Sequence, residues 1–154
     1  MQKQLNAVKL FHTTYGLGVS EEMKADLGTQ KNNLRFELMK EENEEYLEAV
    51  QNNDLVEIAD ALCDLQYVLS GAVLEFGLGN KFVELFNEVQ RSNMSKTCDT
   101  EEQAQETVEF YTSRGEEAYY EKSGDKYNVH RVSDNKVLKN KYYSSANLKS
   151  ILEK

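Results

Sequence analysis

The segment LMKEENEEYLEAVQNNDLVEIADALCDLQYVL, residues 38–69, carries the densest set of acidic residues at regular helical spacing in this chain. Six of its nine acidic residues form two trios, at positions i, i+1, i+4 and i, i+3, i+7: Glu41, Glu42 and Glu45, then Glu57, Asp60 and Asp64. Residues three and four apart are neighbours on a helix surface, so each trio falls on one side of a helix.

Turn-forming residues divide this segment into two halves. The run Gln-Asn-Asn-Asp at 51–54 interrupts the helical pattern, and Asp54 followed by Glu57 is typical of a capping box. We therefore predict two antiparallel helices joined by a tight turn. At about 1.5 Å of rise per residue, the two acidic trios lie at similar heights and face each other.

Several carboxylates placed this close together disfavour one another's ionisation unless protons or cations neutralise them. Hard divalent cations with oxygen ligands are the natural partners, Mg²⁺ first and Mn²⁺ next. The absence of His or Cys at matching positions argues against zinc. The alternative is a solvated acidic surface, and it stays open because the apolar stripe of the second helix points away from its acids.

The rest of the chain predicts a mainly α-helical protein with an antiparallel four-helix bundle as its core. The helices are expected at about 2–14, 32–51, 54–76 and 81–93, and the absence of proline favours long helices. Apolar residues on two sides of the second helix predict that both sides are covered: Leu34 and Leu38 on one, Phe36, Met39, Leu47 and Val50 on the other.

The sequence pattern changes after Cys98, where strand-like runs begin to alternate with turn-forming residues. A fifth helix is expected from Asp99 or Thr100 to about Ser113, followed by a small β-hairpin or three-stranded meander and a short terminal helix. We divide the chain into a helical core at 1–97 and a C-terminal extension at 98–154 that packs on it.

Composition excludes several classes of function. The net charge of −9 disfavours binding to nucleic acid or an anionic membrane surface. No segment approaches the roughly 20 apolar residues of a membrane span or has the features of a signal peptide. Two cysteines are too few for a disulfide framework, so a cytoplasmic location is expected, with Cys63 a small core residue.

The pattern Glu41-Glu42-x-x-Glu45 followed by Glu57-x-x-Asp60 resembles the EExxE…ExxD signature of the all-α nucleoside triphosphate pyrophosphohydrolases, which include the MazG-like and phosphoribosyl-ATP pyrophosphohydrolase-like proteins. The runs EIADALCDLQYVLSGAVLEFG and LFNEVQRSNMSK, the second at 85–96, are similar to helices of the MazG-like dUTPase-type branch. The resemblance covers roughly residues 1–97, and the C-terminal extension departs from the family pattern.

The resemblance implies Mg²⁺-dependent hydrolysis of a nucleoside triphosphate to a monophosphate and pyrophosphate, by a homodimer or larger homo-oligomer. The metal ligands would be Glu42, Glu45, Glu57 and Asp60. Glu41 would complete the metal site or act as general base. Asp64 would contact the ligands without binding the metal itself. Arg91, Asn93 and Lys96 would bind substrate, since cationic and amide donors suit phosphate oxygens. Basic residues that complement a helix C-terminus are the alternative for this last group.

Two alternatives belong to other classes of function. A di-iron carboxylate bundle uses Glu-x-x-His pairs, and neither His12 nor His130 follows a glutamate at that spacing. A noncatalytic helical interaction protein with an acidic face, or an enzyme acting on phosphoribosyl-ATP, remains as the alternative.

Overall fold

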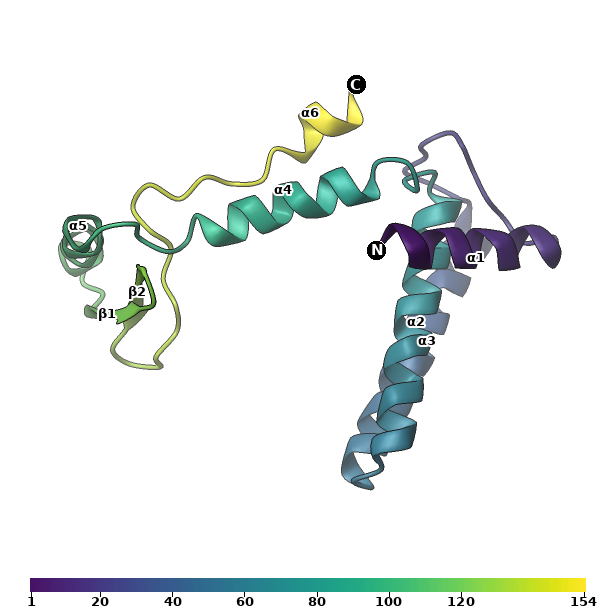
Figure 1. Ribbon diagram of the computed structural model, residues 1–154, viewed down its shortest axis with the longest axis horizontal. Helices are drawn as coiled ribbons and strands as arrows, with labels where there is room; N and C mark the ends of the chain where they lie inside the picture. Colours follow the sequence, from purple (N-terminus) through teal and green to yellow (C-terminus); the bar gives the residue numbers. More distant parts are fainter. The chain divides into compact units, whose positions relative to one another are not determined.

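The computed structural model describes residues 1–154 and divides into two compact units, Met1–Val83 and Glu84–Lys154. Helices make up the first unit: α1 (Gln2–Thr14), α2 (Thr29–Gln51) and α3 (Leu55–Glu75). The second unit contains a small sheet and the remaining helices: α4 (Phe82–Met94), α5 (Glu101–Thr112), β1 (Ala118–Ser123), β2 (Lys126–Arg131) and α6 (Leu148–Leu152) (Figure 1).

The mainly helical class is confirmed, and every expected helix lies within a few residues of its predicted position. The four-helix bundle is not confirmed, because α1 to α3 form one unit and α4 belongs almost entirely to the other. The division between the units falls at the start of α4, whereas the predicted division into domains followed residue 97. No helix combines the length and apolar character needed to cross a membrane.

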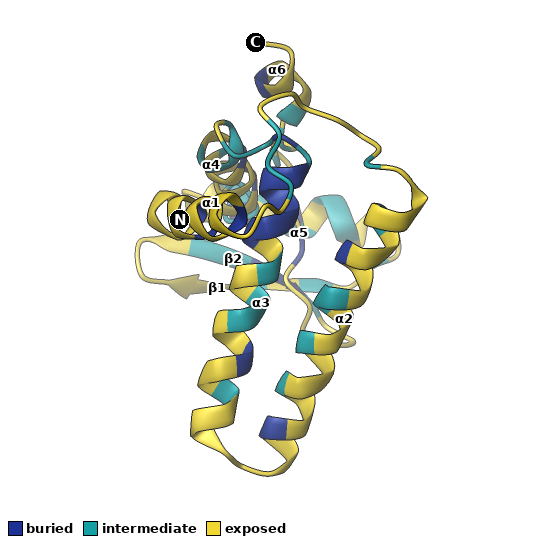
Figure 2. Ribbon diagram, turned by 90° about the vertical axis from the view of Figure 1, so that its right-hand side faces the viewer, coloured by how far each residue is buried: buried dark blue, intermediate teal, exposed yellow.

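The turn between α2 and α3 has the Asp54 half of the predicted capping box, whereas the Asp54 N–H donates to the Ala49 carbonyl instead of the Glu57 side chain. The Asp54 carboxylate accepts hydrogen bonds from the backbone N–H groups of Val56 and Glu57, at 3.0 and 3.2 Å. Asn53 adopts a left-handed conformation with φ of 53°, which closes the tight turn. The two helices then run side by side, and Ala49 and Ala61 are buried on them (Figure 2).

A network of buried charged and polar groups ties α1, α2 and α3 together at the end away from this turn. Arg35 Nε donates to Glu75 Oε2 at 2.7 Å, and both side chains are at most 10% exposed. His12 is buried, and its Nδ1 lies 2.7 Å from the Gly18 carbonyl oxygen, so it has a packed structural role. A Cβ at Gly71 would lie 2.9 Å from Arg35 Nη1, so only glycine leaves room here.

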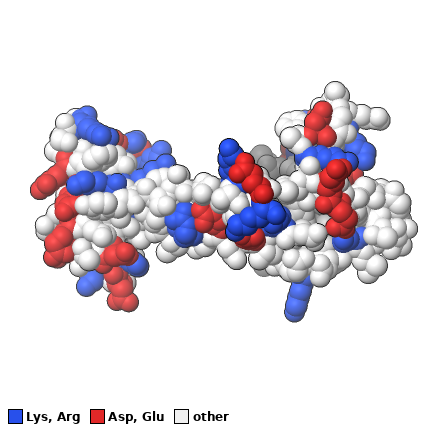
Figure 3. All heavy atoms as spheres, turned by 90° about the horizontal axis from the view of Figure 1, so that it is seen from above, with Lys and Arg blue, Asp and Glu red and all other residues white.

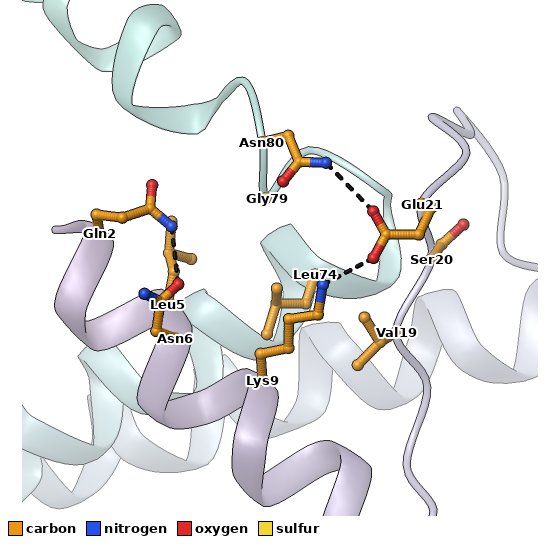
Figure 4. Close-up of a pocket in the computed structure, with 10 residues that line it drawn as sticks. All are labelled: Gln2, Leu5, Asn6, Lys9, Val19, Ser20, Glu21, Leu74, Gly79 and Asn80. Atoms are coloured by element: carbon orange, nitrogen blue, oxygen red, sulfur yellow. Dashed lines mark hydrogen bonds and ion pairs between the residues drawn. The ribbon is translucent and has the colours of Figure 1, made fainter.

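A smaller polar cluster fixes the loop that follows α1 (Figure 4). Lys9 on α1 donates to Glu21 Oε1 at 2.7 Å, and Asn80 donates to the other oxygen of Glu21 at 3.2 Å. Cys63 is exposed on α3, so the prediction that it is a core residue is wrong. Cys63 borders an open, unfilled groove between α1 and α3, which Leu62 and Tyr67 also line.

The second unit has its own core of Cys98, Ala104, Val129 and Leu138. The two strands pair antiparallel, with Ala118 opposite Arg131. A third strand does not form, because Val137 makes a single isolated bridge with His130. The predicted alternatives of hairpin and meander are therefore resolved in favour of the hairpin.

Candidate functional site

The acidic face of the α2–α3 hairpin contains one side chain in an unfavourable environment. Glu42 is half-buried, and its Oε2 atom is buried without any hydrogen-bond partner. Burial raises the pKa of the Glu42 carboxyl, and the negative charges of Asp64, Glu45, Glu41 and Asp60 raise it further. The structure thus brings Glu42 within electrostatic reach of both acidic trios, as the spacing predicted.

Glu57 lies nearer the closed end of the hairpin. Together with Glu45 it lines an open depression of about 370 Å³, which Glu48, Asn52 and Asp54 also border. Glu45 therefore connects the two parts of the acidic face, since its charge raises the pKa of Glu42 and its side chain lines this depression together with Glu57. Glu41, Glu45, Glu57 and Asp60 are exposed and open to a ligand.

The donor set suits a hard cation. All the groups concerned are carboxylates, which are the ligands that Mg²⁺ and Mn²⁺ prefer. No three His, Cys, Asp or Glu side chains in the structure converge as a ready-made metal-binding group. The unpartnered oxygen of Glu42 nevertheless fits a cation, because a positive charge there would satisfy it and relieve the repulsion.

The predicted phosphate-binding residues lie in the second unit, at the end of α4. Arg91 is already engaged: it forms two 2.8 Å hydrogen bonds with Glu88 and donates to the Ser145 carbonyl oxygen at 3.0 Å. Lys96 Nζ donates to Asn93 Oδ1 at 2.8 Å. Arg91 therefore stabilises the C-terminal segment in this structure, whereas Asn93 and Lys96 pair with each other.

The sequence prediction did not include the Arg35–Glu75 pair. Burial alone would raise the pKa of Glu75, but the hydrogen bond and charge of Arg35, with the charges of Lys31 and His12, lower it. Two signals were available: a single glutamate in the apolar second half of α3, and Gly71 inside that helix. Neither signal identifies the partner, which is 40 residues away in sequence.

These features define a mainly helical protein whose longest helices form a hairpin with a carboxylate-lined face. Residues 8–93 match the family model of phosphoribosyl-ATP pyrophosphohydrolase. The chain therefore belongs to this family, as the resemblance indicated.

A relative with similar sequence is the uncharacterized protein L479 of Acanthamoeba polyphaga mimivirus. The two sequences are 38% identical over 76 residues, which is 46% of this chain and 30% of the viral protein. The chain thus spans less than a third of the length of this relative, and the match supports similarity over that region alone.

Proposed function

We propose that this protein is a Mg²⁺-dependent nucleoside triphosphate pyrophosphohydrolase that cleaves the α–β phosphoanhydride bond, giving a nucleoside monophosphate and pyrophosphate. A noncanonical or deoxyuridine-type nucleotide is the proposed substrate, from the resemblance to the dUTPase-type branch. The observation that carries the proposal is Glu42, whose buried oxygen has no hydrogen-bond partner and whose pKa is raised by burial and by the charges of four other carboxylates.

The carboxylates have separate roles in this proposal. Glu42, Glu45, Glu57 and Asp60 would hold Mg²⁺ or Mn²⁺ between the two helices. Bound Mg²⁺ in such a site neutralises charge on phosphate oxygens and lowers the pKa of the attacking water. Glu41, which is exposed beside Glu42, would accept the proton of that water. Asp64 on α3, whose charge also raises the pKa of Glu42, would restrict the position of the Glu42 side chain.

Asn93 and Lys96 are the proposed contacts to phosphate. Their mutual hydrogen bond leaves the Asn93 amide N–H groups and the remaining ammonium protons of Lys96 available as donors. Arg91 is a weaker candidate than the sequence predicted, because its guanidinium is already paired with Glu88 and with the C-terminal backbone.

We also propose that the active form is a homodimer or larger homo-oligomer. Both apolar sides of α2 remain exposed within one chain, as does the apolar stripe of α3: Leu34, Phe36, Leu47 and Val50 on α2, and Leu55, Leu62 and Leu69 on α3. Leu55 is 77% exposed, which is unusual for a residue in such a stripe. A second copy would supply the cover that the sequence predicts for α2.

The test is pyrophosphate release from a panel of ribo- and deoxyribonucleoside triphosphates and phosphoribosyl-ATP, with and without Mg²⁺. Glu42→Gln and Asp60→Asn should abolish release. Glu44→Gln is the matched control, because Glu44 lies on α2 but pairs with Lys40 in solvent. It should leave the rate unchanged.

The alternatives give different results in the same assay. Release from phosphoribosyl-ATP alone would assign the protein to the activity for which its family is named. Failure of every substrate, with no stabilisation by Mg²⁺, would leave the acidic hairpin as a solvated face of a noncatalytic interaction protein.

A further inference from the structure

The C-terminal segment after the hairpin runs along α4 in the opposite direction and forms a series of hydrogen bonds with it (Figure 1). We call residues 139–147 the strap. Near the end of α4 the strap residue Asn140 binds the turn, then Tyr143 Oη lies 3.0 Å from Ser92 Oγ. Further along, the backbone N–H of Asn147 donates to Glu88 at 2.8 Å. The strap is thus joined to the same stretch that carries Asn93 and Lys96.

Asn140 is the most fully engaged residue of the strap. It is 8% exposed. Its backbone N–H donates to the Lys96 carbonyl at 3.0 Å, and its side-chain amide donates to the Thr97 carbonyl at 2.9 Å. Its Oδ1 accepts from the backbone N–H of Tyr142 at 3.0 Å. A buried side chain with this many bonds holds one geometry, so the turn after α4 is fixed by the strap.

These bonds also bear on the role of the Lys96 ammonium group. A lysine at a helix C-terminus often serves only to bind the exposed carbonyl groups. In this structure other groups bind the exposed carbonyls at the end of α4. Backbone N–H or hydroxyl groups of Ser95, Lys96 and Thr97 donate to the carbonyl oxygens of residues 91–94. Asn140 bonds the next exposed pair, at residues 96 and 97. The ammonium of Lys96 is not needed there, and it forms no ion pair in the structure.

Six of the eleven Lys and Arg side chains in the second unit lie within 4 Å of an acidic side chain. The lysines among them are Lys126, Lys141, Lys149 and Lys154. On the face shown in Figure 3, basic and acidic side chains are interspersed over this unit without one large patch of a single sign. Five cations of this unit have no acidic partner and could attract an anion: Lys96, Arg114, Lys122, Lys136 and Lys139. Lys96 also lies beside the side-chain amide of Asn93, which adds donors for an anion.

We propose that Asn140 is a positioning residue, which holds the turn after α4 so that Lys96 and Asn93 together present donors to a phosphate group of the substrate. This inference rests on the proposed function, and it assigns the C-terminal extension a part in substrate binding. Asn140 itself does not contact the phosphate; it acts through the Lys96 and Thr97 carbonyls.

The first experiment is a double-mutant cycle in the full chain, measured by pyrophosphate release. Lys96→Met should raise KM about tenfold with kcat within about twofold, as expected for loss of a charged hydrogen bond. Asn140→Ala keeps the backbone bond to the Lys96 carbonyl but removes the side-chain bond to the Thr97 carbonyl, so the turn that carries Lys96 loosens and KM should rise by a similar factor. The double variant should be no worse than Lys96→Met, whereas independent effects would multiply to about a hundredfold.

Tyr111→Phe is the matched control, since the Tyr111 hydroxyl donates to the strap at the Lys139 carbonyl, at 3.0 Å, without touching Lys96. It should leave KM unchanged. Should Asn140→Ala fail to fold, Ser95→Ala is the milder variant. It removes the hydroxyl that bonds the Ser92 and Ser144 carbonyls and accepts from the Ser144 N–H. The same KM rise is expected.

A second measurement separates this inference from the proposed function. Inorganic pyrophosphate is titrated into the metal-free protein, and the backbone amide signals of Asn93 and Lys96 are followed by NMR. Both should shift in the wild type and in Tyr111→Phe, and not in Asn140→Ala. Absence of turnover would remove the proposed function while this titration still decides the role of Asn140. Wild-type shifts or a wild-type KM in Asn140→Ala, or multiplying effects in the cycle, would overturn the inference.

Discussion

The buried Arg35–Glu75 pair gives the sharpest stability prediction for this fold. The contact is 2.7 Å, and the two side chains are 10% and 6% exposed. Glu75→Gln keeps the shape of the side chain and removes its charge, which leaves the guanidinium buried without a counter-charge. Breaking a buried pair in this way costs about 3–5 kcal/mol. We expect the N-terminal unit to lose that much unfolding free energy.

The assay is urea unfolding followed through the amide signals of α1, α2 and α3, so that the N-terminal unit is read separately from the second unit. Arg35→Met in the Glu75→Gln background should recover part of the loss, because no unpaired charge then remains buried. The exposed pair Lys40–Glu44 serves as the comparison. At 3.8 Å and in solvent, its removal should change the unfolding free energy by less than about 0.5 kcal/mol.

The pH dependence of the unfolding free energy is a second, independent test of the same pair. The folded pKa of Glu75 is lower than its ordinary value of 4.5. The stability it contributes is therefore fully present above pH 4.5 and is lost as the pH falls through the folded pKa. Glu75→Gln should lack this acid-dependent component. A loss below about 1 kcal/mol at pH 7, together with an unchanged acid limb, would refute the assignment of Arg35 and Glu75 as a stabilising pair.

Three further outcomes are expected. Because burial and neighbouring charges raise the pKa of Glu42, its ionised carboxylate opposes folding, and Glu42→Gln should raise the urea midpoint of the metal-free protein. Mg²⁺ should then stabilise the wild type and not the variant. Gly71→Ala should cost about 1–3 kcal/mol in unfolding free energy despite alanine's better helix propensity, since its Cβ would lie 2.9 Å from Arg35 Nη1. Glu88, with a pKa of about 2 set by its hydrogen bonds from Arg91 and Asn147, should keep the Asn147 amide shift constant down to about pH 3 in NMR spectra. Titration of that shift near pH 4.5 would contradict the contact.

Much of the fold follows from local rules, which is why the sequence predicts it. Apolar residues at helical spacing predict α1 to α4, and Asp54 marks the start of α3 through a bond to its own neighbours. The third strand of the predicted meander fails for a tertiary reason. The segment after β2 turns back at Asn135, with a φ of 59°, and leaves Val137 in a single bridge before Leu138 enters the core.

The candidate site divides in the same way. Glu42 and its carboxylate neighbours are predictable, because spacing on a helix and a short turn fix which side chains share a face. Two features were not predictable, since each joins residues far apart in sequence: the Arg35–Glu75 pair and the bond from Asn140 to the Thr97 carbonyl. Composition gives no partner for a buried arginine, and an asparagine near the end of a chain has no local signal for the turn it binds.

The α2–α3 hairpin is thus stabilised by opposite charges where α1 packs on it and destabilised by like charges near its middle. Arg35 and Glu42 are seven residues apart on α2, or about 10 Å along the axis, so one helix carries both situations. The Arg35–Glu75 pair fixes the helices where α1 also packs, whereas nothing in the chain compensates the carboxylates around Glu42. Ala49 and Ala61 keep the helices close despite that repulsion. A cation bound there would therefore stabilise the half of the hairpin that the chain itself leaves unpaired, and this links metal binding to folding at the proposed active site.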